Sequence, residues 1–389
     1  MSPPISLGKI DIKLLIPITS GVLRIITNYI FINLEAEFFN HPVIYNLLPS
    51  LSRCLGLFFY LREPNIDELC DSDSIKEFKK IKYQKYVFIF LASIFDFLES
   101  ALSYFEDINV DITSGLDIIF VSLFSFLILK TKFYKHQFYV IILSIILIII
   151  LSLLESTNMK ISTEEIIKTA LKIFSLIFNN LVIVIDKYII EKKSATVFEI
   201  FFYNGLITLI LNLIYLIVWN NNEIPDDDQF FYGKELVKYR RKRYFDNFFA
   251  YINEIKIKKR FEIVNIISEI FLEFFIRLLF LYTIKFFSPS YLLLILLIQK
   301  IPSLFYNKYI DWNSYKAYLT IIIFCFLIFL SLVLIEIIEL NFCGLAENTK
   351  KNIQLRAQLD ALEAENIFNV DGKEEIRNTL IDENLETTN

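Results

Sequence analysis

The chain has 389 residues, of which 55% are hydrophobic and 21% are charged. The apolar residues gather in blocks, and the runs 138–154 and 317–335 contain no charged residue. Runs of this length can cross the roughly 30 Å of hydrocarbon in a bilayer. This pattern excludes a water-soluble enzyme of two or three domains. The net charge of −5 gives no reason to expect nucleic acid as a partner.

Motifs for cofactors and metals are missing from the sequence. The eight glycines form neither a G-x-G-x-x-G fingerprint nor a Walker loop. Two histidines, His41 and His136, cannot build a His-rich metal site, and the four cysteines form no C-x-x-C pair. We therefore expect no cofactor, no metal and no catalytic residues, and we do not expect an enzyme.

The apolar blocks, taken in chain order, predict an all-α polytopic membrane protein with ten transmembrane helices. Arg24 lies within the first of them, and Lys300 and Pro302 interrupt the ninth. The ten predicted helices are 12–33, 43–61, 86–105, 111–130, 136–155, 165–190, 197–219, 263–285, 289–309 and 314–338.

The basic residues of the short loops predict the orientation. With a cytosolic N-terminus, fourteen Lys and Arg residues fall on the cytosolic side, against Lys160 and Lys308 on the other. This bias favours cytosolic N- and C-termini. The loop 220–262 conflicts with it, because it would lie on the opposite side and yet is basic at 240–243. If that loop were cytosolic, one predicted helix would be wrong.

The spacing of the predicted helices indicates an internal repeat. Helices three to five start near 86, 111 and 136, and helices eight to ten start near 263, 289 and 314. We expect a 5+5 inverted repeat with a first half at 1–160, a second half at 161–340 and an acidic cytosolic tail at 341–389. Inverted repeats place a solute path between the halves. Membrane thickness alone could also impose such equal intervals.

Ionisable residues inside these helices form the candidate site, because charges at membrane depth are costly and usually functional. Asp96 and Glu99 lie one turn apart on the third helix. Glu273 and Arg277 share a face of the eighth helix and can pair along it. Lys300 lies on the ninth helix, and we expect these five residues to face a central cavity.

Structural roles for the same charges stay open. Asp96 or Glu99 could form a static ion pair with Lys300, and Glu273 could do so with Arg277. A second polar patch on the sixth helix has a similar alternative: Asp186 and Lys187, near its cytosolic end, could simply snorkel toward water. Asn179, Asn180 and, on the fourth helix, Asp117 complete the polar residues of this region.

Several stretches resemble one family of carriers. The third helix, with Asp96 in ASIFDFLESALSYF, the segment 114–141, the hairpin 184–215 and LLIQKIPSLF at 296–305 are similar to parts of the solute carrier family 35 F-subfamily. Its members are nucleotide-sugar-transporter-like proteins of the EamA-like drug/metabolite transporter superfamily. FFNHP at 38–42, before a Cys-containing helix, also resembles it. The likeness covers about 12–345.

The resemblance implies a ten-helix inverted-repeat carrier of endomembranes, with alternating access to a polar central site. It adds Asn204, at the Asn204–Gly205 station of the seventh helix, to the substrate-binding candidates. The chain departs from the family at the fourth helix, where Ser114, Gly115 and Asp117 replace the usual Gln and Arg, and Lys300 replaces an arginine. Substrate chemistry is therefore not carried over.

We expect a transporter of a polar, anionic small metabolite in an endomembrane such as the Golgi, ER, lysosome or vacuole. Lys300 and Arg277 would attract the anion, and the carboxylates would bind hydroxyls, a proton or the basic residues. The expected partners are this solute and the lipid bilayer, with a protein contact for a short tail helix that carries Leu355, Leu359 and Leu362. The alternatives are a membrane-embedded transferase, or a scaffold that acts through its tail.

Overall fold

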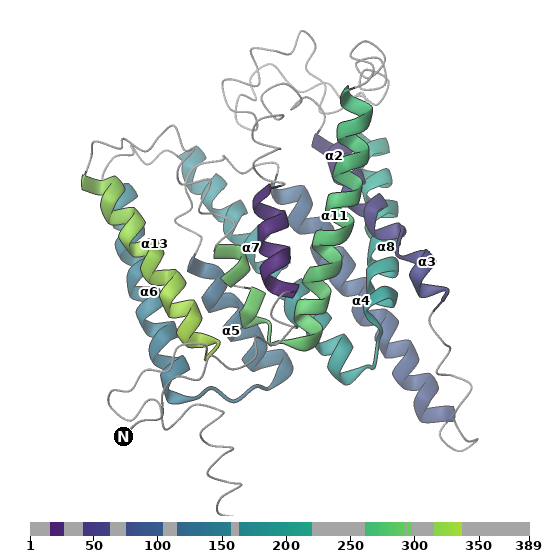
Figure 1. The fold of residues 1–389 in the computed structure, drawn as a ribbon, viewed down its shortest axis with the longest axis horizontal. Helices are drawn as coiled ribbons and strands as arrows, with labels where there is room; N and C mark the ends of the chain where they lie inside the picture. The colour runs from purple at the N-terminus through teal and green to yellow at the C-terminus, as the bar shows by residue number, and fades with distance from the viewer. Residues whose placement is uncertain are drawn as a thin grey trace, which may run out of the picture.

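The computed structural model describes residues 16–26, 42–62, 75–103, 115–156, 163–219, 261–292, 294–297 and 315–336. Almost all of these residues are helical and none of them forms a strand, so the predicted all-α class is confirmed (Figure 1). Most of the predicted loop 220–262, the predicted tail 341–389 and Lys300 lie outside the described residues.

The helices follow the apolar blocks of the sequence. The predicted helix 197–219 coincides with α8, and 165–190 is two residues shorter than α7 at each end. Of the predicted helix 289–309, the short helical segments 290–292 and 294–297 are described. Apart from these two short segments, the described helices in chain order are Ile16–Ile26, α2 (Pro42–Cys54), α3 (Leu57–Tyr60), α4 (Ile75–Ser103), α5 (Leu116–Leu129), α6 (Lys135–Ser156), α7 (Thr163–Lys192), α8 (Val197–Trp219), α11 (Phe261–Phe286) and α13 (Tyr315–Leu334).

Two predicted boundaries are wrong for identifiable reasons. The predicted helix 43–61 is divided into α2 and α3 by a turn at Gly56, where a Cβ would lie 2.6 Å from the ring of Phe201 in α8. Because glycine has no Cβ, this turn can lie close to the ring of Phe201. Helix α4 begins at Ile75 rather than at 86, because its polar first turns are rich in Lys. These residues favour helix without adding hydropathy.

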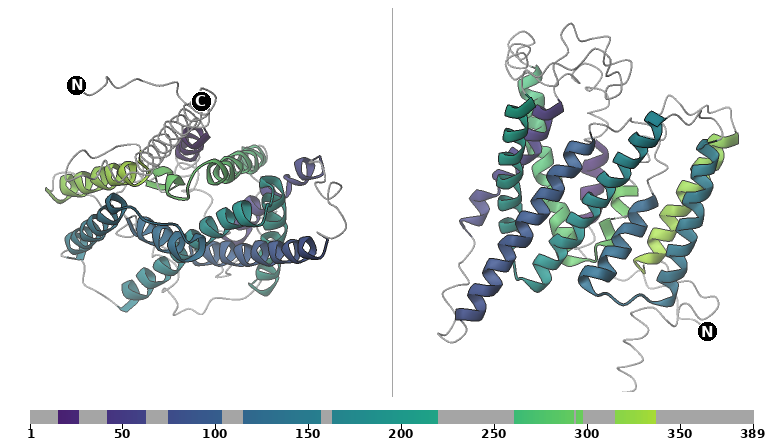
Figure 2. Two further views of the ribbon diagram at one scale, coloured as in Figure 1. Left: turned by 90° about the horizontal axis from the view of Figure 1, so that it is seen from below. Right: turned by 180° about the vertical axis from the view of Figure 1, so that it is seen from behind.

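Helix α7 lies in the middle of the bundle. It packs against α4 and α5 and also meets α11, while α8 packs against α2 and α4, and α13 packs against α6 (Figures 1 and 2). Seen from below in Figure 2, α11 and α13 lie on one side of the row formed by α6, α5, α7 and α4. Segments far apart in the sequence thus meet around α7.

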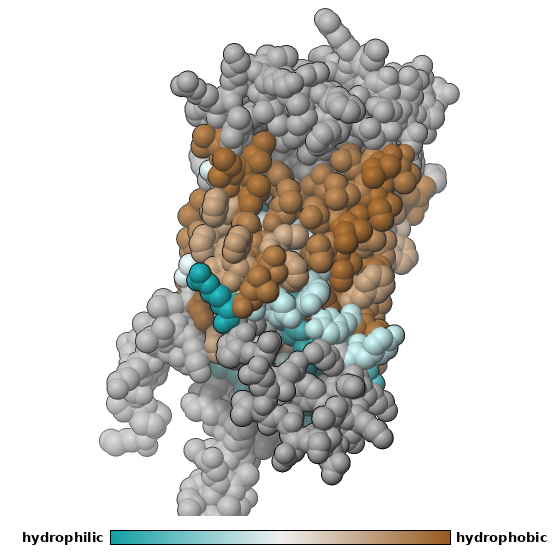
Figure 3. Space-filling model, turned by 90° about the vertical axis from the view of Figure 1, so that its right-hand side faces the viewer, coloured by the Kyte–Doolittle hydropathy of each residue, from teal (hydrophilic) through white to brown (hydrophobic). Residues whose placement is uncertain are grey.

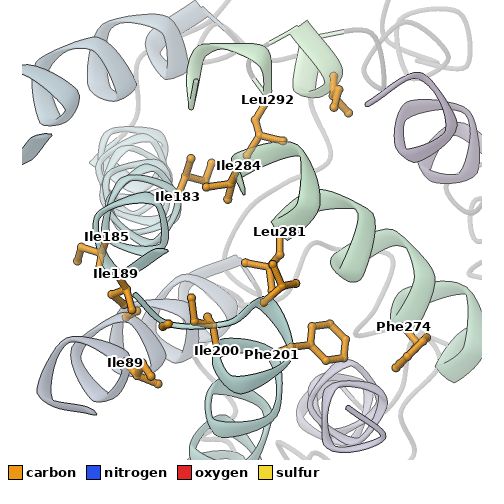
Figure 4. Packing of buried hydrophobic residues seen from close by; sticks show 14 residues of the cluster. Ile89, Ile183, Ile185, Ile189, Ile200, Phe201, Phe274, Leu281, Ile284 and Leu292 are labelled. Carbon is orange, nitrogen blue, oxygen red and sulfur yellow. The ribbon is translucent and has the colours of Figure 1, made fainter. Parts of the chain in front are cut away.

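Two apolar clusters fill the interior, and α7 contributes to both. In one of them Ile183 and Ile189 of α7 meet Ile89, Phe201 and other residues of α4, α8 and α11 (Figure 4). In the second cluster Val184 of α7 packs with residues of α5, α6 and α13. Neighbouring residues of one helix therefore face opposite clusters, so the part of α7 around 182–189 is nearly surrounded by protein.

Outside these clusters, large apolar side chains are exposed along the helices. Phe138 of α6 is 58% exposed and Ile217 of α8 is 74% exposed. Figure 3 shows hydrophobic residues over most of the described surface on one side, with hydrophilic ones gathered toward one end. By length and composition, two described helices can cross a membrane, Thr169–Lys192 and Val197–Val218. The shorter apolar helices are Ile16–Ile26, Leu116–Leu129, Lys135–Ile150 and Tyr318–Leu334.

Lys187 ties α7 to the end of α11. Its Nζ donates hydrogen bonds of 2.7 and 2.8 Å to the carbonyl oxygens of Ile284 and Phe287, and it forms an ion pair of 2.9 Å with Glu191. The last carbonyls of a helix have no partner within the helix and carry partial negative charge. The expectation that Lys187 snorkels toward water is wrong, because the side chain is buried against these carbonyls.

Replacing Lys187 should therefore destabilise the protein. Lys187→Met keeps the aliphatic stem but leaves the carbonyls of α11 without their donor, at a cost of about 1–3 kcal/mol. We expect a lower midpoint of thermal unfolding for the purified protein in detergent. Lys192→Met, at an exposed position of the same helix, is the control and should leave the midpoint unchanged. Equal losses in the two variants would contradict the assigned role.

Candidate functional site

A small polar cavity lies between α2, α4, α7, α8 and α11. Its volume is about 30 Å³, which is room for about two water molecules. One part of its wall is apolar and comes from α7, α8 and α11. The polar part consists of Arg53, Asp96, Asn179, Asp186, Asn204 and Arg277.

Arg53 is the centre of one ionic group. Its Nη1 forms an ion pair with Asp96 of α4 and donates a hydrogen bond of 2.7 Å to Oδ1 of Asn204 in α8. The side chains of Arg53 and Asp96 are only 7% and 6% exposed. Because charges removed from water are costly unless paired and hydrogen-bonded, this group holds α2, α4 and α8 in one arrangement.

Gly205 makes this arrangement sterically feasible. A Cβ at Gly205 would lie 2.4 Å from Cβ of Arg53 and 2.9 Å from its carbonyl carbon. The backbones of α8 and α2 therefore approach so closely that only a glycine fits between them. Small residues at helix crossings permit such approaches, and here the approach brings Arg53 within reach of the neighbouring Asn204.

A second ionic group centres on Glu273 of α11. Arg24, from the helix Ile16–Ile26, donates from Nη1 to Oε1 of Glu273 at 2.8 Å. Arg277, one turn along α11, places its Nε 3.7 Å from Oε2 of Glu273. The predicted pairing of Glu273 with Arg277 along the helix is thus confirmed. Since Arg277 also lines the cavity, it connects the two ionic groups.

Asp186 of α7 lines the cavity without a matching donor. The residue is 5% exposed, and its Oδ1 has no hydrogen-bond partner in the described part of the chain. The Nε atoms of Arg53 and Arg277 also lack a hydrogen-bond partner there. The expectation that Asp186 snorkels is wrong, because α11 covers this part of α7.

Three predicted site residues, Asp96, Asn204 and Arg277, line the cavity, and Glu273 adjoins it through Arg277. Glu99 lies one turn beyond Asp96 and is not part of the lining; Oγ of Ser100 donates to it at 3.4 Å. Lys300 lies outside the described residues, and the observed ionic partner of Asp96 is Arg53.

Sequence reasoning missed Arg53. The signal was present, since Arg53 is an ionisable residue inside a predicted membrane helix, as are Asp96 and Glu273. Asp117 is also an ionisable residue inside a predicted membrane helix, but it does not line the cavity. It is buried in α5 and accepts a hydrogen bond of 2.7 Å from Asn180. Burial of a charge therefore identifies a polar contact, and only the assembled helices show which contacts share a cavity.

Comparison with known proteins adds no assignment. No family model matches the chain, and no curated protein sequence matches it. The resemblance to solute carrier family 35 therefore stays a prediction, and the function is inferred from the geometry of the cavity and its surroundings.

The close contact at Gly205 predicts a strong effect of a single methyl group. Gly205→Ala should push α8 away from α2 and weaken the Arg53–Asn204 hydrogen bond, at about 1–3 kcal/mol. Gly21→Ala is the matched control, because a Cβ there would meet Ile295 at an ordinary 3.7 Å. Thermal unfolding of both purified variants measures the difference. Equal tolerance of the two alanines would contradict the proposed crossing.

The buried Arg53–Asp96 pair predicts a non-additive double-mutant cycle. Arg53→Met and Asp96→Asn each remove one partner, and Arg53→Met leaves a buried carboxylate uncompensated; losses of about 3–5 kcal/mol are expected for such changes. The double variant removes both charges and should lose less stability than the sum of the two losses. Urea or thermal unfolding of the three variants measures this, and simple additivity would contradict a direct pairing.

Proposed function

We propose that this protein is a multi-pass membrane carrier that moves a polar small metabolite with an anionic group by alternating access. The observation that carries the proposal is the cavity between five helices, lined by two arginines, Arg53 and Arg277, and two aspartates, Asp96 and Asp186. Its walls come from both predicted halves, α2 and α4 from the first and α7, α8 and α11 from the second. A carrier needs such a site between two bodies that can move.

The exposed apolar side chains support a location in a bilayer. Soluble monomers rarely expose a large contiguous apolar patch, and burial of apolar area is worth about 25 cal/mol per Å². Side chains such as Phe138, Ile217 and Phe271 are exposed along α6, α8 and α11, while Glu199 of α8 and Glu273 of α11 are buried. Lipid contact accounts for both observations. We place the carrier in an endomembrane with both termini in the cytosol, and loop 220–262 opposite.

Several of the helix contacts support the inverted repeat. If each helix of the first half is exchanged for its equivalent in the second, Ile16–Ile26 becomes α7, α2 becomes α8, α4 becomes α11 and α6 becomes α13. The contact of α4 with α8 then becomes that of α11 with α2, and both occur. The contacts of α2 with α8 and of α6 with α13 become themselves, as a two-fold axis requires.

Ionic residues follow the same exchange. The contact of α4 with α7 becomes a contact of α11 with Ile16–Ile26, which the Arg24–Glu273 ion pair supplies. Asp96 and Glu273 lie at equivalent positions along their predicted helices, and each forms an ion pair with an arginine from another helix. This correspondence supports two structurally related halves around the cavity.

The described conformation fits a closed state of such a carrier. A cavity of about 30 Å³ holds water, whereas sites for small metabolites are typically about ten times larger. Solute access therefore requires the helices around Arg53 and Arg277 to separate. In this mechanism the arginines bind the anionic group, the aspartates receive the remaining polar groups, and Glu99 and Lys300 stay candidates from the sequence.

Counterflow in liposomes tests the proposal. The purified full chain is reconstituted and screened with labelled organic acids, amino acids, sugar phosphates and nucleotide sugars, each against liposomes preloaded with the same unlabelled compound. We expect transient accumulation of at least one solute, and a loss of about tenfold or more in Arg277→Gln, because a charged contact to the solute is removed. Arg62→Gln, exposed and outside the cavity, is the control.

The same preparation separates the alternatives. Chemical conversion of a donor lipid or sugar without counterflow would favour a membrane-embedded transferase. Neither counterflow nor product formation, from protein that remains folded, would count against the carrier and favour the scaffold.

A further inference from the structure

The balance of charges around the cavity restricts which polar solute can bind. The two ionic groups and Asp186 together contain as many carboxyl groups as guanidinium groups. With all six of these side chains charged, an added anion would leave a net negative charge among the described residues, in a region with little water, and such a charge is costly. A solute without net charge avoids this cost. The residues counted are Arg24, Arg53 and Arg277 against Asp96, Asp186 and Glu273.

The unsatisfied atoms around the cavity favour a ligand that carries both signs of charge. Nε of Arg53 and Nε of Arg277 donate no hydrogen bond among the described residues, although Nε of Arg277 lies 3.7 Å from Oε2 of Glu273. Oδ1 of Asp186 accepts none there. Buried polar groups without partners are rare and call for a ligand, water or ion. A carboxylate would serve the arginines, and an ammonium group would serve Asp186.

The remaining wall of the cavity is apolar. Figure 4 shows Ile183 beside Ile284, and Leu281 pointing toward Ile200 and Phe201, and all five line the cavity. Val182 and Phe280 extend this wall. An apolar wall opposite a few polar groups is the usual composition of a small-molecule site. It fits a solute with an apolar side group rather than one covered with hydroxyls.

We infer that the transported solute is a zwitterion with an apolar side group, of the chemical class of the apolar amino acids. Its ammonium group binds Asp186, its carboxylate binds Arg277 and Arg53, and its side group lies against Ile183, Leu281 and their neighbours. This inference rests on the proposed carrier function and narrows its solute. Because the bound solute has no net charge, the Arg53–Asp96 pair need not break for binding.

A matched set of probes tests the inference on the full chain in detergent. Leucine, phenylalanine and tryptophan are compared with the carboxylic acids that lack their amino group and the amines that lack their carboxylate. We expect thermal stabilisation by at least one amino acid, with half-maximal concentrations about tenfold or more higher for its two analogues. Equal stabilisation by the carboxylic acid would overturn the inference.

Asp186→Asn supplies the second measurement. The amide has the shape of the carboxyl group but no charge, so binding of the amino acid should weaken about tenfold or more while the carboxylic acid analogue binds as well as or better than before. Asp117→Asn is the control, because Asp117 is a buried aspartate outside the cavity. If Asp186 carries a proton instead of meeting an ammonium group, Asp186→Asn would keep the amino acid's affinity, and the inference fails.

Failure of this inference differs from failure of the proposed function. Counterflow of a solute without an ammonium group, together with no stabilisation by any of the amino acids, would contradict the zwitterionic solute. The proposed carrier function would still be supported. Absence of counterflow for every solute of the screen and of stabilisation by every probe would overturn both.

Discussion

The ion pair between Arg53 and Asp96 is the constraint on which the arrangement of the helices depends. Both side chains are almost fully buried, so neither can turn to water if its partner moves. Asn204 must therefore accept from the same guanidinium group, and α8 must come close enough to α2 that position 205 cannot carry a side chain. One buried charge pair thus explains the glycine at position 205, the position of the Asn204 amide and the packing of α2, α4 and α8.

Asp186 and Lys187 illustrate how neighbouring charges serve different purposes. Lys187 is satisfied by the carbonyls at the end of α11 and by Glu191, so its charge holds two helices together. Asp186 is equally buried, yet one of its oxygens has no donor in the described part of the chain. A fold that needed only stability would pair both residues. The unsatisfied carboxyl group is therefore the stronger indication of a ligand.

The sequence predicted helices better than it predicted their partners. Hydropathy located α8 to the residue, because both ends of its apolar run are marked by polar residues, but it missed the polar start of α4 and the turn at Gly56. The rule for charges within membrane helices identified Asp96, Glu273 and Arg277. It did not indicate that Arg24 would meet Glu273. Such pairings depend on which distant helices pack together, and spacing along one helix carries no information about that.

The two ionic groups also differ in how they connect the halves of the proposed carrier. Arg53 and Asp96 both belong to the first half, and their link to the second half is the hydrogen bond to Asn204. Arg24 connects the halves directly, but its side chain is 30% exposed, and Glu273 keeps Arg277 as a second partner. Of the contacts made by these two groups, movement of one half against the other would thus break a hydrogen bond to an amide and one partly exposed ion pair. Arg53, Asp96 and Glu273 would each keep an ionic partner, which avoids the several kcal/mol that an unpaired buried charge costs. The pair of Lys85 with Glu199, at 2.7 Å, also joins α4 of the first half to α8 of the second, so opening has to preserve this contact or replace it.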